Sequence, residues 1–208
     1  MCTNNASELP IITIDTETGG LDADKNALLS FGIYTPESKD SILNNNCCIL
    51  NNNYYFKGDY VVVDDDISYP SIGKKNIITT AALRVNHLNV DYLNNNGNNL
   101  EYVDEVLSKS LSGTKFRVLG QNLKFDLGFI SDRLPLTYKQ FMKQRHHMEL
   151  MDFSMLYHYF IKNPSKKLSL DSMREEFGIN SGIAHSSYVD AVDTRKVYDA
   201  IVSTIVLR

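Results

Sequence analysis

A β-branched run near the N-terminus is followed directly by two acidic residues, and this feature constrains the chain most. Ile11–Ile14 has the composition of a buried strand, and Asp15 and Glu17 come next. Side chains at positions i and i+2 of a strand share a face, so the two carboxylates are expected about 6–7 Å apart. Like charges at that spacing are costly without a cation, and carboxylate oxygens are ligands for Mg²⁺ or Mn²⁺. The alternative is a solvated strand end whose acids have no role.

The rest of the apolar pattern predicts a mixed α/β domain, with strands early in the chain and helices late. The expected strands are Ile11–Ile14, Ala27–Tyr34, Ser41–Leu50, Phe116–Leu119 and Met148–Met151. The expected helices are Phe125–Leu134, Phe153–Ile161, Leu170–Phe177, which Gly178 ends, and Ser187–Leu207. Between residues 51 and 99 the pattern is weak, and loops with one short helix are expected. Asparagine triplets such as Asn51–Asn53 are interpreted as loop expansions without chemistry.

Composition limits the class of protein. A length of 208 residues with 43% hydrophobic and 22% charged residues predicts a single globular domain over residues 1–208, with its core at about 11–205. The net charge of −4 excludes attraction to nucleic acid through a global positive field, so any such binding must be local. The three cysteines, Cys2, Cys47 and Cys48, offer no disulfide framework or zinc spacing, and no apolar run approaches membrane-spanning length. A cytoplasmic protein without membrane association is expected.

Two further motifs carry acids at the ends of expected elements. Asp126 stands just inside a helix that follows a buried strand, where the helix dipole alone favours an acid. His185 stands five residues before Asp190, and a segment containing Gly182 leads up to it. Each motif alone has an ordinary explanation, a first-turn acid in one case and an exposed or structural histidine in the other. Their importance depends on their combination with the N-terminal pair.

In combination, the motifs resemble the DEDDh branch of the DnaQ-like 3′→5′ exonucleases over about residues 11–205. The matching blocks, in the family's order, are Asp15-x-Glu17, Asn122-x-x-Phe125-Asp126 and His185-x4-Asp190. Two weaker agreements are Ala82-x3-Asn86-His87-Leu88, similar to a small helix of the family, and Asp152-x3-Leu156, which opens a later helix. The tyrosine branch of the family would place Tyr where Ser186 stands. Many members have His in place of Gln121 and Ala in place of Ser187, but neither position is a metal ligand in the family.

The resemblance implies a ribonuclease H-like fold, a mixed five-stranded sheet flanked by helices. It implies a hydrolase that releases nucleoside 5′-monophosphates from nucleic-acid 3′ ends with two Mg²⁺ ions, for which Mn²⁺ substitutes. By the same resemblance, the metal ligands are Asp15, Glu17, Asp126 and Asp190, and His185 is the general base.

The resemblance also indicates where a 3′ end binds. The implied substrate-binding residues are Thr18, Gly19, Leu21, Asn122 and Phe125. In this interpretation the backbone N–H groups of Thr18 and Gly19 bind the 3′-hydroxyl, and Leu21 wedges against the terminal base; core packing is the alternative for Leu21 and Phe125. Two basic clusters are candidates for a strand path. They are Lys139, Lys143, Arg145, His146 and His147, and Lys162, Lys166 and Lys167.

Several alternatives remain open at this stage. DNA of the proofreading or repair type is preferred over RNA only because such members are common in the family, and an RNA-trimming enzyme has the same motifs. A catalytically silent domain that binds nucleic acid or a polymerase partner is a non-enzymatic alternative, and a homodimer is possible. Haloacid-dehalogenase-type phosphatases also begin with a strand-end Asp, but Glu17 and the His185-x4-Asp190 motif argue against that mechanism.

Overall fold

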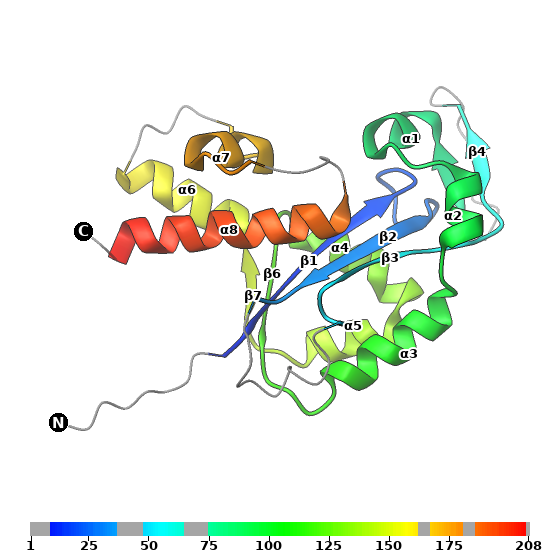
Figure 1. Ribbon diagram of the computed structural model, residues 1–208, viewed down its shortest axis with the longest axis horizontal. Coiled ribbons are helices and arrows are strands. Elements are labelled where there is room, and N and C mark those ends of the chain that lie inside the picture. Colours follow the sequence, from blue (N-terminus) through cyan, green and yellow to red (C-terminus); the bar gives the residue numbers. More distant parts are fainter. Residues whose placement is uncertain (1–8, 37–47, 65–74, 162–166, 181–185, 207–208) are drawn as a thin grey trace.

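A five-stranded mixed sheet forms the centre of the computed structural model, which describes residues 9–36, 48–64, 75–161, 167–180 and 186–206 (Figure 1). The strands, in the spatial order β3-β2-β1-β6-β7, are β3 (Asn52–Tyr55), β2 (Leu28–Tyr34), β1 (Ile11–Thr18), β6 (Arg117–Gly120) and β7 (His147–Glu149). β2 pairs antiparallel with both β1 and β3, whereas β6 pairs parallel with both β1 and β7. β1 is therefore the central strand, where the antiparallel and parallel halves meet.

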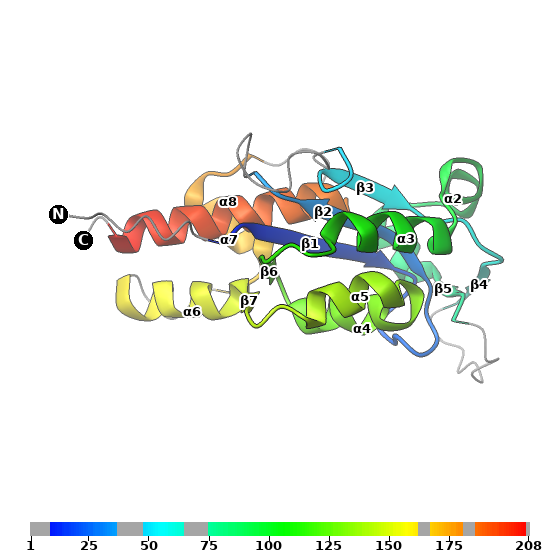
Figure 2. The ribbon, with the colours of Figure 1, turned by 90° about the horizontal axis from the view of Figure 1, so that it is seen from below.

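Helices cover both faces of this sheet. In chain order they are α1 (Thr80–Asn86), α2 (Val90–Asn96), α3 (Leu100–Leu111), α4 (Leu123–Arg133), α5 (Pro135–Met142), α6 (Leu150–Ile161), α7 (Leu170–Phe177) and α8 (Ser187–Val206). α3, α4 and α5 lie on one side of β1, and α8 crosses the other side (Figure 2). α6 and α7 pack against α8. A small parallel pair, β4 (Val61–Val63) and β5 (Ile77–Thr79), stands apart from the main sheet.

The alternation of side chains along β1 separates two cores. Ile12 and Ile14 are fully buried in the cluster that includes Phe129 of α4 and Phe141 of α5. Ile11 belongs instead to the cluster formed with α6, α7 and α8. Because side chains two residues apart share a face, Asp15 and Glu17 project to the same side of the sheet as Ile11, the side that α8 covers.

Much of the expected order of elements is confirmed. The first two predicted strands are β1 and β2, which pair antiparallel, and β6, α4, α7 and α8 lie within two residues of their predicted bounds over the part of the chain that the structure describes. Gly178 ends α7 in the left-handed conformation (φ 62°), as its position predicts. The small helix expected after Ala82 is α1, although it begins at Thr80, and Asp152 lies in the first turn of α6 as expected.

In the middle of the chain one prediction is tested only at its end, where it is not borne out, and another is wrong. Residues 41–47 of the expected third strand lie outside the described residues, residues 48–50 form a turn, and the next strand is β3. The expectation of loops and one helix over 51–99 is wrong, because three strands and two helices lie there. Asn52 and Asn53 of β3 have weak strand propensity, but Tyr54 and Tyr55 favour a strand, and hydrogen bonding to β2 supplies the pairing. β7 also begins one residue early, and α6 follows it directly at Leu150.

Hydropathy gives no membrane-spanning candidate: within the described ranges, no helix combines the length and the apolar character that crossing a bilayer demands.

Candidate active site

Three carboxylates meet between the end of β1 and the start of α8. Asp15 and Glu17 come from β1 and Asp190 from the first turn of α8, and one oxygen of each lies within 4.8 Å of the others. Asp190 is buried, and Asp15 and Glu17 are half-buried. The pair predicted from strand periodicity thus meets the acid of the predicted C-terminal motif.

The environment favours the protonated forms of the two acids of β1, Asp15 and Glu17. Burial raises the pKa of Glu17 to about 8, with the charges of Asp190 and Asp126 acting in the same direction. Burial also raises the pKa of Asp15 well above its ordinary value, again helped by neighbouring carboxylates and opposed by Arg174. A bound cation reverses this balance, because it stabilises the ionised carboxylates.

The fourth predicted acid, Asp126, approaches from the opposite face of the sheet. It lies in the first turn of α4, is buried, and accepts a hydrogen bond from the hydroxyl of Thr16 at 2.7 Å. Burial raises its pKa to about 7, while the Thr16 hydrogen bond lowers it. Its charge acts on both Asp15 and Glu17, although its oxygens are not part of the group of three within 4.8 Å.

A glutamate that sequence reasoning missed fixes the start of α4. Asn122 has a left-handed backbone (φ 61°), which asparagine tolerates better than most residues. The two oxygens of Glu149 accept hydrogen bonds from the backbone N–H groups of Asn122 and Leu123, each at 2.7 Å. A carboxylate at this position is favoured by the helix dipole. Glu149 therefore orients the helix that carries Asp126, and no local sequence signal indicates it because its partners are 26 and 27 residues away.

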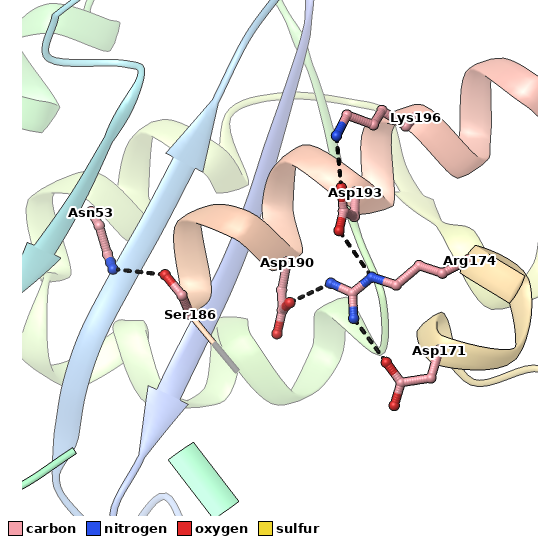
Figure 3. A network of polar contacts seen from close by, with 7 residues as sticks. All are labelled: Asn53, Asp171, Arg174, Ser186, Asp190, Asp193 and Lys196. Carbon is pink, nitrogen blue, oxygen red and sulfur yellow. Dashed lines mark hydrogen bonds and ion pairs between the residues drawn. The ribbon is translucent and has the colours of Figure 1, made fainter. Parts of the chain in front are cut away.

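Neutral hydrogen bonds hold the start of α8 against the sheet. Asn53 of β3 donates to the hydroxyl of Ser186 at 3.3 Å and accepts from that of Ser187 at 2.7 Å (Figure 3 shows the first). The Ser187 hydroxyl also lies 2.8 Å from that of Ser30 on β2. Gly32 permits this approach, because a Cβ there would lie 2.2 Å from the Ser187 backbone. An asparagine interpreted as loop expansion thus helps to place Asp190.

A buried arginine that the sequence did not single out joins α7 to α8 beside Asp190 (Figure 3). Arg174 donates to Asp190, to Asp193 at 3.0 Å and to Asp171 at 2.8 Å. Lys196 donates to the second oxygen of Asp193 at 2.9 Å. Burial opposes the charged form of Arg174, but the hydrogen bond and charge of Asp190, with those of the other acids, leave its pKa raised above the ordinary value.

The predicted substrate-binding residues fall into two sets. Leu21, Asn122 and Phe125 line one opening of about 310 Å³, and the side chain of Leu21 is 88% exposed, so core packing does not explain it. Thr18 is buried, and its hydroxyl donates to the carbonyl of Gly20.

The expected role of the Gly19 backbone is not supported. Its N–H already donates to the carbonyl of Ala27 at 2.8 Å, so it is not a donor for a 3′-hydroxyl. A glycine is required here for another reason: a Cβ would lie 2.3 Å from the carbonyl oxygen of Ile77. Gly19 thus allows β5 to pass close to the end of β1.

A second cavity, of about 420 Å³, is lined by residues that neighbour Asp190 in the sequence. Its lining includes Ser186 and Val189 next to the acid, Tyr55 of β3, Asn86 at the end of α1 and Tyr92 of α2. Both cavities are of the size of small-molecule binding sites. The carboxylates therefore lie close to two openings rather than in a closed core.

The basic clusters and the histidine are placed differently. Lys143, Arg145 and His146 line a third cavity together with Lys115, at the start of β6 and β7. Leu9 lines it as well, and Asp15 is six residues further along the chain, or about 20 Å in a strand. This basic cluster does not adjoin the carboxylates. His185, Lys162 and Lys166 lie outside the described residues, and Lys167 is exposed.

The donor set fits a hard divalent cation. All the grouped ligand atoms are carboxylate oxygens, which suit Mg²⁺ or Mn²⁺, and among the described residues no cysteine or histidine belongs to the group. Burial and the charges of Asp190 and Asp126 raise the pKa of Glu17 to about 8, and a bound cation would favour its ionised form. The arrangement is suited to binding a cation between the end of β1 and the start of α8.

A mixed sheet covered by helices on both faces, with acids from its central strand meeting an acid of the last helix, is a fold of the ribonuclease H-like class, and solved structures match it. Exonuclease I of E. coli in complex with a dT13 oligonucleotide superposes with a TM-score of 0.67 at 14% identity, over 94% of this chain and 41% of that one. Its zinc-bound complex with single-stranded DNA gives 0.70 at 16% identity, over 97% and 42%. The ligand-free enzyme gives 0.64 at 16% identity, over 95% and 42%.

The fold is therefore that of the DnaQ-like 3′→5′ exonucleases, as the motifs predicted. This chain spans about two fifths of the length of these exonuclease I chains. No family model matches the sequence, and no curated protein matches it either.

Proposed function

We propose that the protein is a metal-dependent 3′→5′ exonuclease that hydrolyses the terminal phosphodiester of a nucleic acid to release nucleoside 5′-monophosphates. The observation that carries this proposal is the meeting of Asp15, Glu17 and Asp190 within 4.8 Å on an exonuclease fold. Asp126 is the fourth acid, held on the far side of β1 by Thr16. Attack on a phosphodiester adds negative charge to a group that is already anionic, so a site of this kind needs concentrated positive charge.

In the proposed mechanism, two divalent cations supply that charge when bound. Asp15, Glu17, Asp126 and Asp190 would hold them, and the packing of α4 and α8 against β1 fixes the spacing of these acids. His185 accepts the proton of the attacking water, since an imidazole titrates near neutral pH. The leaving 3′-oxygen departs with the rest of the strand, and the released nucleotide carries the phosphate.

We further propose that the substrate is a single-stranded DNA 3′ end. Solved structures of exonuclease I contain dT13 and dA16 oligonucleotides, which supports DNA as the first substrate to test. The opening lined by Leu21, Asn122 and Phe125 offers an exposed apolar edge and an aromatic ring to unpaired bases. Contacts of this kind tolerate any base sequence, as an exonuclease requires.

A degradation assay tests the proposal. A 5′-labelled single-stranded DNA and an RNA of the same sequence are incubated with Mg²⁺, with Mn²⁺ and with chelator. Progressive shortening of the DNA from its 3′ end is expected with either metal and not with chelator. Asp15→Ala and His185→Ala should each abolish it. Faster shortening of the RNA would assign an exoribonuclease, and binding of either strand without shortening would indicate a catalytically silent domain.

The substrate opening has its own test. Leu21→Ala should raise KM for single-stranded DNA about tenfold, from the loss of roughly 1–1.5 kcal/mol of contact with the terminal base. The side chain is exposed, so the thermal midpoint should stay unchanged. Lys124→Ala in the wall of the same opening is the matched control for electrostatic effects, because its loss should raise KM at low salt and make KM less sensitive to salt, without removing apolar contact. An unchanged KM for Leu21→Ala would remove this residue from the substrate site.

A further inference from the structure

Arg174 is a buried arginine that forms three ion pairs beside the candidate metal site. Its side chain is only 8% exposed, and its three nitrogens bond three different carboxylates: Nε bonds Asp193, Nη1 bonds Asp171 and Nη2 bonds Asp190. Two of these acids lie outside the group of Asp15, Glu17 and Asp190. Only the third bond connects the arginine to the candidate metal site.

From this geometry we infer that Arg174 is a positioning residue, which holds the carboxylate of Asp190 in the orientation that binds the divalent cation. The inference rests on the proposed function and names one determinant of metal affinity at that site. Figure 3 shows the guanidinium reaching from α7 to Asp190 on α8. The bond engages Oδ1 of Asp190, so the guanidinium restrains the orientation of this carboxylate.

Electrostatics explains why Asp190 needs such a partner. Without a cation, the charges of Asp15 and Glu17 repel Asp190, and a carboxylate on the first turn of a helix can rotate away from them. The guanidinium is planar and permanently charged, so it offsets this repulsion while fixing direction. Metal ligands are commonly held by a second group in this way, and loss of that group typically lowers metal affinity about 10–100-fold.

The same network supplies the reason that Arg174 itself does not move. Asp193 is 1% exposed and binds both Arg174 and Lys196, so it anchors the guanidinium inside the α7–α8 contact. Asp171 is 72% exposed, and an ion pair of this kind contributes little to stability. Asp171→Asn is therefore a matched control: it removes one partner of Arg174 without touching Asp190 or the buried anchor.

The test is a calorimetric titration of the full chain with Mn²⁺, in the absence of nucleic acid, together with thermal unfolding. Arg174→Met should weaken Mn²⁺ binding about 10–100-fold relative to the unsubstituted protein. Arg174→Lys should recover only part of the loss, because one ammonium group cannot reproduce the planar fork. Asp171→Asn should bind within about threefold of the unsubstituted protein. At saturating Mn²⁺, kcat of Arg174→Met should lie within about threefold of the kcat of the unsubstituted protein.

A double variant separates positioning from stability. Arg174→Met leaves Asp193 buried with one partner fewer, and this lowers the thermal midpoint. Arg174→Met/Asp193→Asn removes the buried charge and should recover the midpoint while Mn²⁺ binding stays weak. Recovery of tight binding together with the midpoint would overturn the inference in favour of a structural ion pair, as would Arg174→Met binding Mn²⁺ as tightly as the unsubstituted protein.

Asp15→Asn distinguishes this failure from failure of the proposed function. If Asp15→Asn loses Mn²⁺ binding and Arg174→Met keeps it, only the positioning role is wrong. If the unsubstituted protein binds Mn²⁺ no more tightly than Asp15→Asn, the metal site fails, and both the proposed function and the role of Arg174 fail with it.

Discussion

Neighbouring residues of β1 point to opposite faces of the sheet, and the two faces have different roles in the molecule. On the face toward α4 and α5, Ile12 and Ile14 are fully buried among apolar side chains, each of which contributes roughly 1.5–3 kcal/mol by burial. On the face toward α8, burial and neighbouring carboxylates raise the pKa of Asp15 and of Glu17, so both acids destabilise the folded chain when ionised. One face thus stabilises the fold that the other uses to hold like charges together.

Substitutions on the two faces should have opposite consequences. Asp15→Asn should lower exonuclease activity at least about 10³-fold, because a cation ligand is lost. At pH 8 with chelator it should not lower the thermal midpoint, because it removes a charge that repels its neighbours. Ile14→Ala should instead cost about 2–5 kcal/mol of stability through the cavity it leaves. Activity assays well below the midpoint and thermal unfolding measure both effects.

Two outcomes would contradict this difference between the faces of β1. If Ile14→Ala, assayed while folded, lost as much activity as Asp15→Asn, the two faces would not be separable. If Asp15→Asn unfolded at a markedly lower temperature in chelator, the carboxylate would be stabilising the fold rather than straining it.

The pH dependence of stability sharpens the same contrast. Glu17 has a folded-state pKa of about 8 against an ordinary value of 4.5, so between these values the folded chain keeps a proton that the unfolded chain loses. Its contribution is therefore neutral below about pH 4.5 and increasingly destabilising up to about pH 8. Asp15 and Asp126 act in the same direction. With chelator, the thermal midpoint should fall between pH 5 and 8.

Mg²⁺ should reverse that fall, since it binds the ionised acids and releases protons. At a hundred times its dissociation constant it contributes about 2.7 kcal/mol, or roughly 5–10 °C for a chain of this size. Glu17→Gln should flatten the chelator profile. A midpoint that rises from pH 5 to 8 in chelator would contradict the assigned direction of these pKa shifts.

The features that the sequence predicted depend on residues close together along the chain, and the features that it missed depend on residues far apart along the chain. The shared face of Asp15 and Glu17 depends only on strand periodicity, and α7 has both bounds as predicted because local signals, including Gly178, define its end. The unpredicted helix α5 begins at Pro135, and the carboxylate of Asp104 caps it from 32 and 33 residues away. No local pattern contains that contact.

The supporting residues of the site show the same limit. Asn53 contacts Ser186 across 133 positions, and Arg174 contacts Asp190 across 16, between two helices whose packing is tertiary. Motifs therefore predicted the acids themselves, which belong to a family pattern, but not the groups that orient them. Those groups depend on how β3, α7 and α8 come together in this chain.

Thr16 links the two faces, because its side chain points to the α4 face and binds an acid of the site. Its hydroxyl donates to Asp126 at 2.7 Å, and a hydrogen bond to a charged group contributes about 1.5–3 kcal/mol. Thr16→Val should lower kcat/KM about tenfold, and Thr16→Ser, which keeps the hydroxyl, should stay within about threefold. Equal losses in both variants would mean that the methyl group and its packing, not the hydrogen bond, place Asp126.

Asn53 gives the smallest effect, because it acts on the start of α8 rather than on an acid directly. Asn53→Ala removes its hydrogen bonds to Ser186 and Ser187, worth about 1 kcal/mol each, and should lower the thermal midpoint by roughly 4–8 °C. Activity at saturating Mg²⁺ should fall only about threefold, since Asp190 keeps its contact with Arg174. Asn52→Ala, in the exposed neighbouring position, should change neither quantity appreciably. If Asn53→Ala abolished activity while Arg174→Met did not, β3 rather than α7 would be the element that orients Asp190.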